Sequence, residues 1–172
     1  MEEVLVNRVA NSVLVTINLE SFYPEGEVMS FDLKDHLFMG LILKEKEFRE
    51  ALQAHDWSRY TGKNLAVFCS EDAIIPMWAY MLVASYAGAY ARDIVLAKPE
   101  QFVELAYLKK LAAIDPNDFA GKRLVIKGCS DKPVPASAYL EITRLLQPVA
   151  RSIMFGEPCS TVPVYKKAKT AE

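Results

Sequence analysis

The alternation of apolar and polar positions predicts two strands near the start of the chain. Residues 11–19 (N-S-V-L-V-T-I-N-L) are rich in Val, Ile and Thr, which favour strands. Residues 27–33 (E-V-M-S-F-D-L) alternate between apolar and polar side chains, and the turn-forming sequence Tyr23-Pro24-Glu25-Gly26 separates the two segments. The pattern predicts an N-terminal antiparallel β-hairpin.

The remainder of the chain contains the same pattern twice. Residues 62–99 align with residues 121–158 without a gap, and 11 of the 38 aligned positions are identical. We call this the repeat alignment. Each copy has a helix, an apolar run after Gly-Lys, a polar loop that ends in proline, a second helix and a second apolar run. Pro76 and Pro135 are predicted in the first turns of their helices, where the missing N–H costs nothing.

This repetition predicts an internal duplication, over about 43–99 and 102–158. Apolar strands that alternate with helices are typical of parallel sheets covered by helices. We therefore predict an α/β fold: a mostly parallel sheet flanked by helices, preceded by the hairpin. The length fits one domain over 1–172. Its expected segments are N-terminal strands (1–42), repeat one (43–99), repeat two (100–158) and a C-terminal tail (159–172).

Composition and charge limit the cellular location and the classes of binding partner that we expect for this protein. The net charge of −2 gives no basic surface for nucleic acid. The acidic start, Met1-Glu2-Glu3, does not match a signal peptide, and the longest apolar stretch, residues 74–91, is typical of a buried helix. Three cysteines without close pairing favour a reducing compartment. We therefore expect a cytoplasmic protein with no nucleic-acid or membrane partner.

The three cysteines carry the candidate chemistry. Each follows a predicted strand and each precedes a serine. In open parallel sheets, ligands bind beyond the carboxyl ends of the strands, where helix dipoles also lower the pKa of a thiol. The candidate binding residues are therefore Cys129, Ser130, Asp131, Cys159, Ser160, Cys69 and Asp72. Cys129 and Cys159 follow successive strands, which tend to be neighbours, so they are the candidate ligands of a metal ion.

Ordinary structural roles compete with this interpretation. A free cysteine commonly packs as a small apolar residue, and Asp72 and Asp131 could cap helices or set up turns. His36 and His55 each lie beside an aspartate, which fits a base or a plain polar contact. The sequence contains no CxxC or HExxH motif. Lys132 and Arg144 could favour an anion, without a phosphate-binding glycine loop to support it.

Several longer motifs resemble one bacterial family. They are V-N-R-V-A-N-S (6–12), F-D-L-K-D (31–35), G-L-I-L-K-E-K-E-F-R (40–49), H-D-W-S-x-Y (55–60), C-S-x-D-A-I-x-P-x-W-A-Y (69–80), K-G-C-S-D-K-P-V-P (127–135) and M-F-G-E-P-C-S-T-V-P-V-Y-K-K (154–167). The chain is similar in these motifs to the family known as domain of unknown function 2480. The resemblance implies no activity and no catalytic residue. The family's genes often lie near those for iron–sulfur cluster assembly, which implies thiol chemistry and a protein partner in sulfur or iron–sulfur metabolism.

Three functional hypotheses remain open from the sequence. The first is a thiol-based binding or accessory protein for a metal, a sulfur species or an iron–sulfur cluster. The second is an enzyme with a cysteine nucleophile that Asp131 or His36 orients. The third is an interaction module, or a homo-oligomer, without a small-molecule site.

Overall fold

The structure is a computed structural model that describes residues 14–128 and 131–168. The chain divides into two compact units. One joins the N-terminal part, up to Tyr23, to the C-terminal part from Tyr107 onward, and we call it the terminal unit. The other, the central unit, runs from Pro24 to Ala106. The assignment of residues 1–172 to a single domain stays a prediction.

The central unit is built on a parallel sheet of three strands in the order β2-β5-β6. The strands are β2 (Val28–Asp32), β5 (Asn64–Phe68) and β6 (Asp93–Leu96), and a small antiparallel hairpin is formed by β3 (Leu37–Phe38) and β4 (Ile42–Leu43). The helices are α1 (Glu45–Ala54) and α2 (Met77–Ala87), with the 3-10 turns η2 (Leu33–His36), η3 (Trp57–Tyr60) and η4 (Pro99–Gln101). Apolar side chains from the sheet, α1 and α2 form its core, including Phe31, Phe48, Leu65 and Val83.

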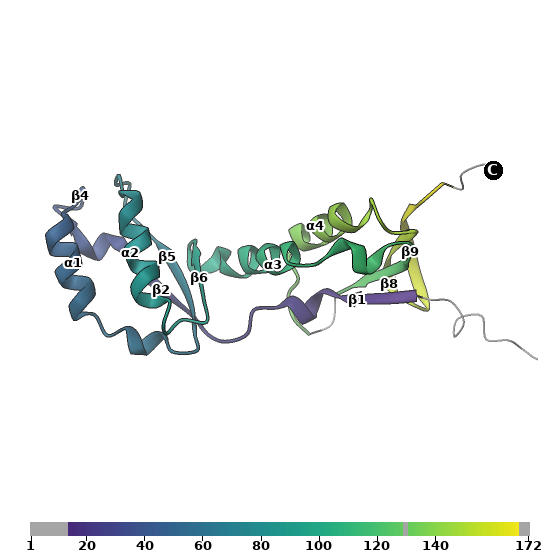
Figure 1. Ribbon diagram of the computed structural model, residues 1–172, viewed down its shortest axis with the longest axis horizontal. Helices are drawn as coiled ribbons and strands as arrows, with labels where there is room; N and C mark the ends of the chain where they lie inside the picture. Colours follow the sequence, from purple (N-terminus) through teal and green to yellow (C-terminus); the bar gives the residue numbers. More distant parts are fainter. Residues whose placement is uncertain (1–13, 129–130, 169–172) are drawn as a thin grey trace, which may run out of the picture. The chain divides into compact units, whose positions relative to one another are not determined.

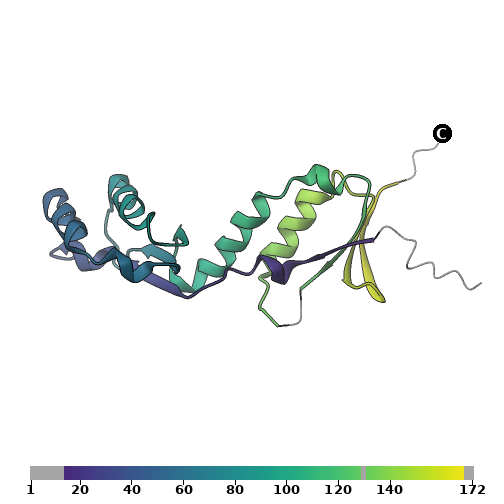
Figure 2. The ribbon, with the colours of Figure 1, turned by 60° about the horizontal axis from the view of Figure 1, so that its bottom comes forward.

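The terminal unit contains a sheet of four strands in the order β1-β7-β8-β9. The strands are β1 (Leu14–Asn18), β7 (Arg123–Lys127), β8 (Ser152–Glu157) and β9 (Ser160–Lys166). The first three are parallel, and β9 pairs antiparallel with β8 at the edge. α4 (Ala136–Leu146) connects β7 to β8 and faces the sheet (Figure 2). This unit also holds η1 (Leu19–Phe22) and η5 (Pro116–Phe119), and α3 (Phe102–Ala112) begins in the central unit's range and ends in this one.

The elements recur as the repeat alignment predicts. β5, α2 and the first residue of β6 align with β7, α4 and the first residue of β8 (Figure 1). The backbone repeats as well: the aligned residues Gly62 and Gly121 have φ angles of 70° and 69°. Their N–H groups donate to Tyr90 and Val149, which are also aligned, at 3.1 and 2.8 Å. The order of elements and these hydrogen bonds are thus repeated, and a duplication remains our interpretation of why.

The predicted fold class is confirmed, since the parallel strands are flanked by helices, although they are divided between two sheets. The predicted N-terminal hairpin is wrong. β1 pairs parallel with β7, and β2 pairs parallel with β5, so the two strands lie in different sheets. Alternation along a strand reports which face is buried, but it does not report the neighbouring strand.

Three further observations concern the two prolines, the C-terminal tail and the length of the helices. α2 begins at Met77 and α4 at Ala136, so Pro76 and Pro135 stand directly before the first helical residue, as the missing N–H favours. Residues 160–166, expected in a C-terminal tail, form the edge strand β9. Among the described residues, no helix has the length and apolar content needed to cross a bilayer.

Candidate functional site

Cys69 lies at the carboxyl end of the central unit's sheet, as the sequence predicts. It directly follows β5 and is half-buried against the core. The Tyr80 side chain on α2 lies close to it: burial first, and then the charge of an ionised Cys69, raise the pKa of the Tyr80 hydroxyl. Tyr80 therefore stays protonated at neutral pH and can serve only as a neutral hydroxyl beside the thiol.

Asp32 organises the loop that follows Cys69. Its carboxylate accepts hydrogen bonds of 3.0 Å from the backbone N–H groups of Lys34 and Ser70. Burial raises the pKa of Asp32, but the hydrogen bonds from Ser70 and Lys34 and the charge of Lys34 outweigh it, so the pKa falls below its usual value. The end of β2 is thereby attached to the loop after β5, a contact that no motif in the sequence indicates.

Asp72 and Asp131 are both exposed and neither caps its helix. The residues that precede α2 and α4 are prolines, and no side chain caps either helix. The backbone N–H of Asp131 instead donates to the Glu20 carboxylate at 3.2 Å. Neither aspartate therefore caps its helix, because the polar loops place each one several residues ahead of it; the alternative role, in a turn that leads into the helix, stays a prediction.

The cysteine pair proposed as metal ligands is only partly described. Cys129 and Ser130 lie outside the described residues. Cys159 is exposed in the tight turn between β8 and β9, and Ser160, the first residue of β9, is exposed as well. No cluster of three or more His, Cys, Asp or Glu side chains suited to a metal ion occurs within residues 14–128 and 131–168.

One ion pair links the chain segments that lead to these two cysteines. The Lys127 ammonium lies 3.3 Å from the Glu157 carboxylate. Lys127 ends β7 and Glu157 ends β8, and each stands two residues before a cysteine, Cys129 or Cys159. The two segments therefore begin at the carboxyl ends of neighbouring strands, on the same side of the sheet.

The histidines belong to an aromatic cluster in the central unit. His36 stacks on Phe31 with the ring centroids 5.3 Å apart, and the His55 ring nitrogen lies 3.1 Å from the Tyr60 hydroxyl. Burial is the main cause that lowers the pKa of both histidines. At His36 the charge of Asp35 partly opposes this effect. At His55 the charges of Arg59 and His36 lower the pKa further. Both rings are thus neutral packing groups at pH 7. Among the described residues, neither histidine contacts a cysteine.

The anion site proposed near Lys132 and Arg144 receives little support. Arg144 forms two hydrogen bonds, of 2.8 and 2.6 Å, with the Glu141 carboxylate one turn earlier on α4. The Lys132 ammonium lies 5.5 Å from the centre of the Tyr23 ring. Arg144 is therefore already neutralised by its own helix.

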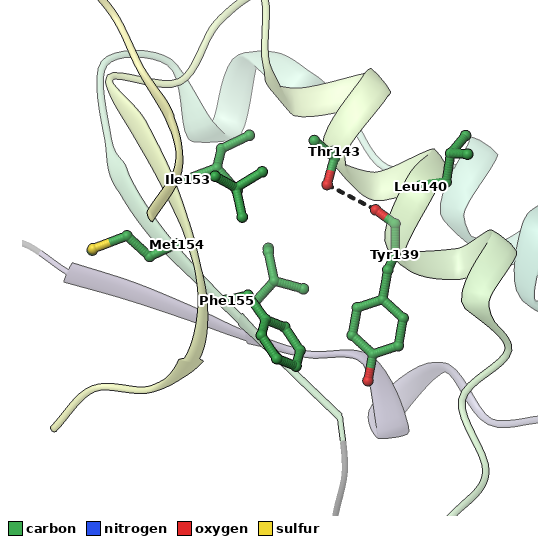
Figure 3. A pocket seen from close by; sticks show the side chains of 8 residues that line it. Tyr139, Leu140, Thr143, Ile153, Met154 and Phe155 are labelled. Carbon is green, nitrogen blue, oxygen red and sulfur yellow. Dashed lines mark hydrogen bonds between the residues drawn. The ribbon is translucent and has the colours of Figure 1, made fainter. Parts of the chain in front are cut away.

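A concave apolar site in the terminal unit was not anticipated. We call it the α4 groove: a pocket of about 520 Å³ between α4 and β7, β8 and β9. It is lined by Ile126, Tyr139, Leu140, Thr143, Ile153, Met154, Phe155 and Val164 (Figure 3). The rings of Tyr139 and Phe155 meet edge to face with their centroids 5.7 Å apart. β9 adds to the floor of the groove, so the site depends on the strand that the sequence did not reveal.

The two hydroxyl groups at the α4 groove are engaged in hydrogen bonds. The Tyr139 hydroxyl donates to the Gly128 carbonyl at 2.8 Å. The Thr143 hydroxyl donates to the Tyr139 carbonyl at 2.7 Å, as the dashed line in Figure 3 marks. The residues exposed to the interior of the groove are otherwise apolar. In the sequence, the only indication of this groove is that two apolar residues, Val162 and Val164, flank Pro163.

Comparison with known proteins supports the resemblance seen in the motifs. Residues 3–167 match the family described as "Protein of unknown function (DUF2480)". The chain belongs to this family. No curated protein and no solved structure matches the chain. The family assignment is therefore confirmed, and it brings no activity, ligand or site residue with it.

Proposed function

We propose that the protein is a binding protein that takes a small apolar ligand in the α4 groove. The observation that carries the proposal is the distribution of exposed apolar side chains. In the described part of the terminal unit, the large exposed apolar residues are Leu140, Phe155, Val162 and Val164. Three of them line the groove, and the fourth, Val162, pairs with Phe155 across the β8–β9 ladder. Apolar surface gathered at one hollow is typical of a binding site.

The size and chemistry of the α4 groove define the ligand class. Its volume of about 520 Å³ lies within the range of about 300–1,000 Å³ for small-molecule pockets. The hydroxyl groups of Tyr139 and Thr143 already donate to backbone carbonyls. Those two hydroxyl oxygens can still accept, but the other lining side chains are apolar, so each further polar group of a ligand would lose its hydrogen bonds to water at a cost of about 1–3 kcal/mol. An alkyl or aryl body fits this site better.

An uncharged fluorescent probe, 1-N-phenylnaphthylamine, tests the proposal. We expect its emission to rise on addition of the protein, and Leu140→Gln and Val164→Gln to weaken its binding by about tenfold, or about 1.4 kcal/mol. Met81→Gln is the matched control, because Met81 aligns with Leu140 in the repeat alignment and is 71% exposed against 70%. Equal loss in the control, or no binding by the unmodified protein, would contradict the proposal.

A second candidate function is thiol-based binding of a metal or sulfur species, favoured by the Lys127–Glu157 ion pair. This contact of 3.3 Å brings together the segments that precede Cys129 and Cys159. Exposure of Cys159 keeps its sulfur accessible. In this proposal the protein works in the reducing cytoplasm, as an accessory protein with a partner in sulfur or iron–sulfur metabolism.

Elemental analysis of protein purified without oxygen tests the thiol proposal. We expect Cys129→Ser and Cys159→Ser each to abolish loading while the melting temperature changes little. Loss of stability in both variants, with no change in bound metal or sulfur, would identify the cysteines as packing residues. A cysteine that titrates well below about 8.5 would instead favour the enzyme hypothesis, with a thiolate nucleophile.

A further inference from the structure

The tip of the β3–β4 hairpin has a conformation that its sequence does not favour. Met39 and Gly40 have φ angles of 55° and 72°, and the Leu41 N–H donates to the Phe38 carbonyl at 3.2 Å. Two consecutive positive φ angles define a type I′ turn, in which Asn or Gly is preferred at the first central position. Met39 occupies that position and is 78% exposed. Met39 therefore neither favours the conformation of the turn nor contributes a buried side chain to the core.

Exposed apolar side chains occur on two segments of the central unit, the hairpin and the loop that leads into α2, and we group them as the hairpin patch: Phe38, Met39, Leu41, Ile42, Ile74 and Met77. All six side chains are exposed, Ile74 to 90%. They flank residues that point inward: Leu37 and Leu43 of the hairpin and Ala73 and Ile75 of the loop before α2 belong to one core cluster. Both segments follow the carboxyl ends of neighbouring strands, β2 and β5, and lie at the same end of the central unit (Figure 1).

Charge around the hairpin patch is predominantly acidic. Asp35, Glu71 and Asp72 are exposed, and none is paired with a lysine or arginine among the described residues. The nearby Lys44 ammonium is already held by Glu47 at 3.0 Å and by the Phe38 ring at 3.3 Å. Lys34 is the remaining exposed cation in these two segments. An apolar centre with excess carboxylates complements a partner of the opposite charge.

We propose that the hairpin patch is a docking surface for a basic amphipathic segment of a partner protein. Methionines adapt to varied apolar side chains, and long apolar anchors on an exposed rim suit the i, i+3, i+4 face of a helix. The carboxylates of Asp35, Glu71 and Asp72 would meet lysines or arginines beside that face. Anionic lipid is a poorer match, because the same carboxylates are repelled by its surface. This surface is separate from the α4 groove and does not depend on it.

A fluorescently labelled synthetic helix of leucine and lysine, with leucine at helical spacing, is a suitable probe. We expect it to bind the full chain, with binding weakened by added salt, and a peptide with glutamate in place of lysine not to bind. Ile74→Gln and Met77→Gln should each weaken binding by about tenfold, without loss of stability because both side chains are exposed.

Met39→Asn separates recognition from folding. Asparagine suits the left-handed position, so this variant should keep or raise the melting temperature while binding falls by about tenfold. Unchanged binding in Met39→Asn and Ile74→Gln, or equal binding of the glutamate peptide, would overturn the proposal. Equal weakening by Leu140→Gln would move the peptide site to the α4 groove. Binding to phosphatidylglycerol vesicles that Met39→Asn abolishes would make the patch a lipid surface and overturn the assigned partner.

Discussion

The Tyr139 hydroxyl occupies space that a side chain at Gly128 would need. It donates to the Gly128 carbonyl at 2.8 Å, and a Cβ built on Gly128 would lie 2.9 Å from the same oxygen. In the repeat alignment, the corresponding pair in the central unit is Tyr80 and Cys69. A side chain is accommodated there, and burial first, then an ionised Cys69, raises the pKa of the Tyr80 hydroxyl. The two aligned strand ends thus differ: a glycine lies beside the tyrosine in the terminal unit, and a cysteine lies beside it in the central unit.

Gly128→Ala should destabilise the protein by about 1–3 kcal/mol, because the new methyl group displaces the Tyr139 oxygen from its hydrogen bond. Tyr139→Phe alone should cost about 1 kcal/mol. Urea denaturation of both single variants and of the double variant measures the coupling. We expect Gly128→Ala to cost less in the Tyr139→Phe background, where no oxygen stands in the way. The same cost in both backgrounds would show that Val134 or Leu19, and not Tyr139, limits the space.

The histidine cluster predicts a loss of stability in mild acid. Burial lowers the pKa of both His36 and His55 in the folded chain. The unfolded chain, with a histidine pKa of about 6.5, therefore binds protons first as the pH falls. The free energy of unfolding should be highest above that pH and should decrease as the pH drops through it toward the folded pKa values.

Tryptophan fluorescence can follow this transition in the central unit, because both tryptophans, Trp57 and Trp78, lie there. His36→Phe keeps an aromatic ring against Phe31 and removes one ionisable group, so it should flatten the profile. A profile that is unchanged in this variant would assign the acid sensitivity to other groups.

Asp32 should contribute to stability through its two backbone partners. Asp32→Ala leaves the N–H groups of Lys34 and Ser70 without their acceptor, at an expected cost of about 1–2 kcal/mol. Because the pKa of Asp32 is lowered in the folded state, its contribution is present above a pH of about 4 and is lost as the pH falls through the folded value. Thermal denaturation at neutral pH and in strong acid tests this. Asp72→Ala, at an exposed carboxylate of the same loop, is the control and should change little.

Thiol accessibility should differ between the two described cysteines. Cys159 is exposed in a turn, whereas Cys69 is half-buried beside Tyr80. In a Cys129→Ser background, Ellman's reagent should modify Cys159 in a fast phase and Cys69 in a slower one, with mass spectrometry identifying each site. Faster modification of Cys69 would mean that the carboxyl end of β5 opens more readily than its packing indicates.

The sequence by itself determined the local elements. The strands at 14–18 and 28–32, the Gly-Lys turns and the helices after Pro76 and Pro135 follow from side-chain period, glycine conformation and proline placement, which act within a few residues. The repeat alignment likewise predicted which elements recur. These features are encoded where they occur, so one chain is enough to read them.

Only the tertiary structure decided which strands are neighbours. β1 joined β7, which lies far later in the chain, and β2 joined β5; β5 and β7 are inner strands of their sheets, and most of their residues are buried. The pairing of β9 with β8 then completed the α4 groove, in a segment expected to be a C-terminal tail and containing Pro163. Proline is accepted there because β9 is an edge strand. Partners and edges depend on chain segments far apart in the sequence, and local pattern carries no information about them.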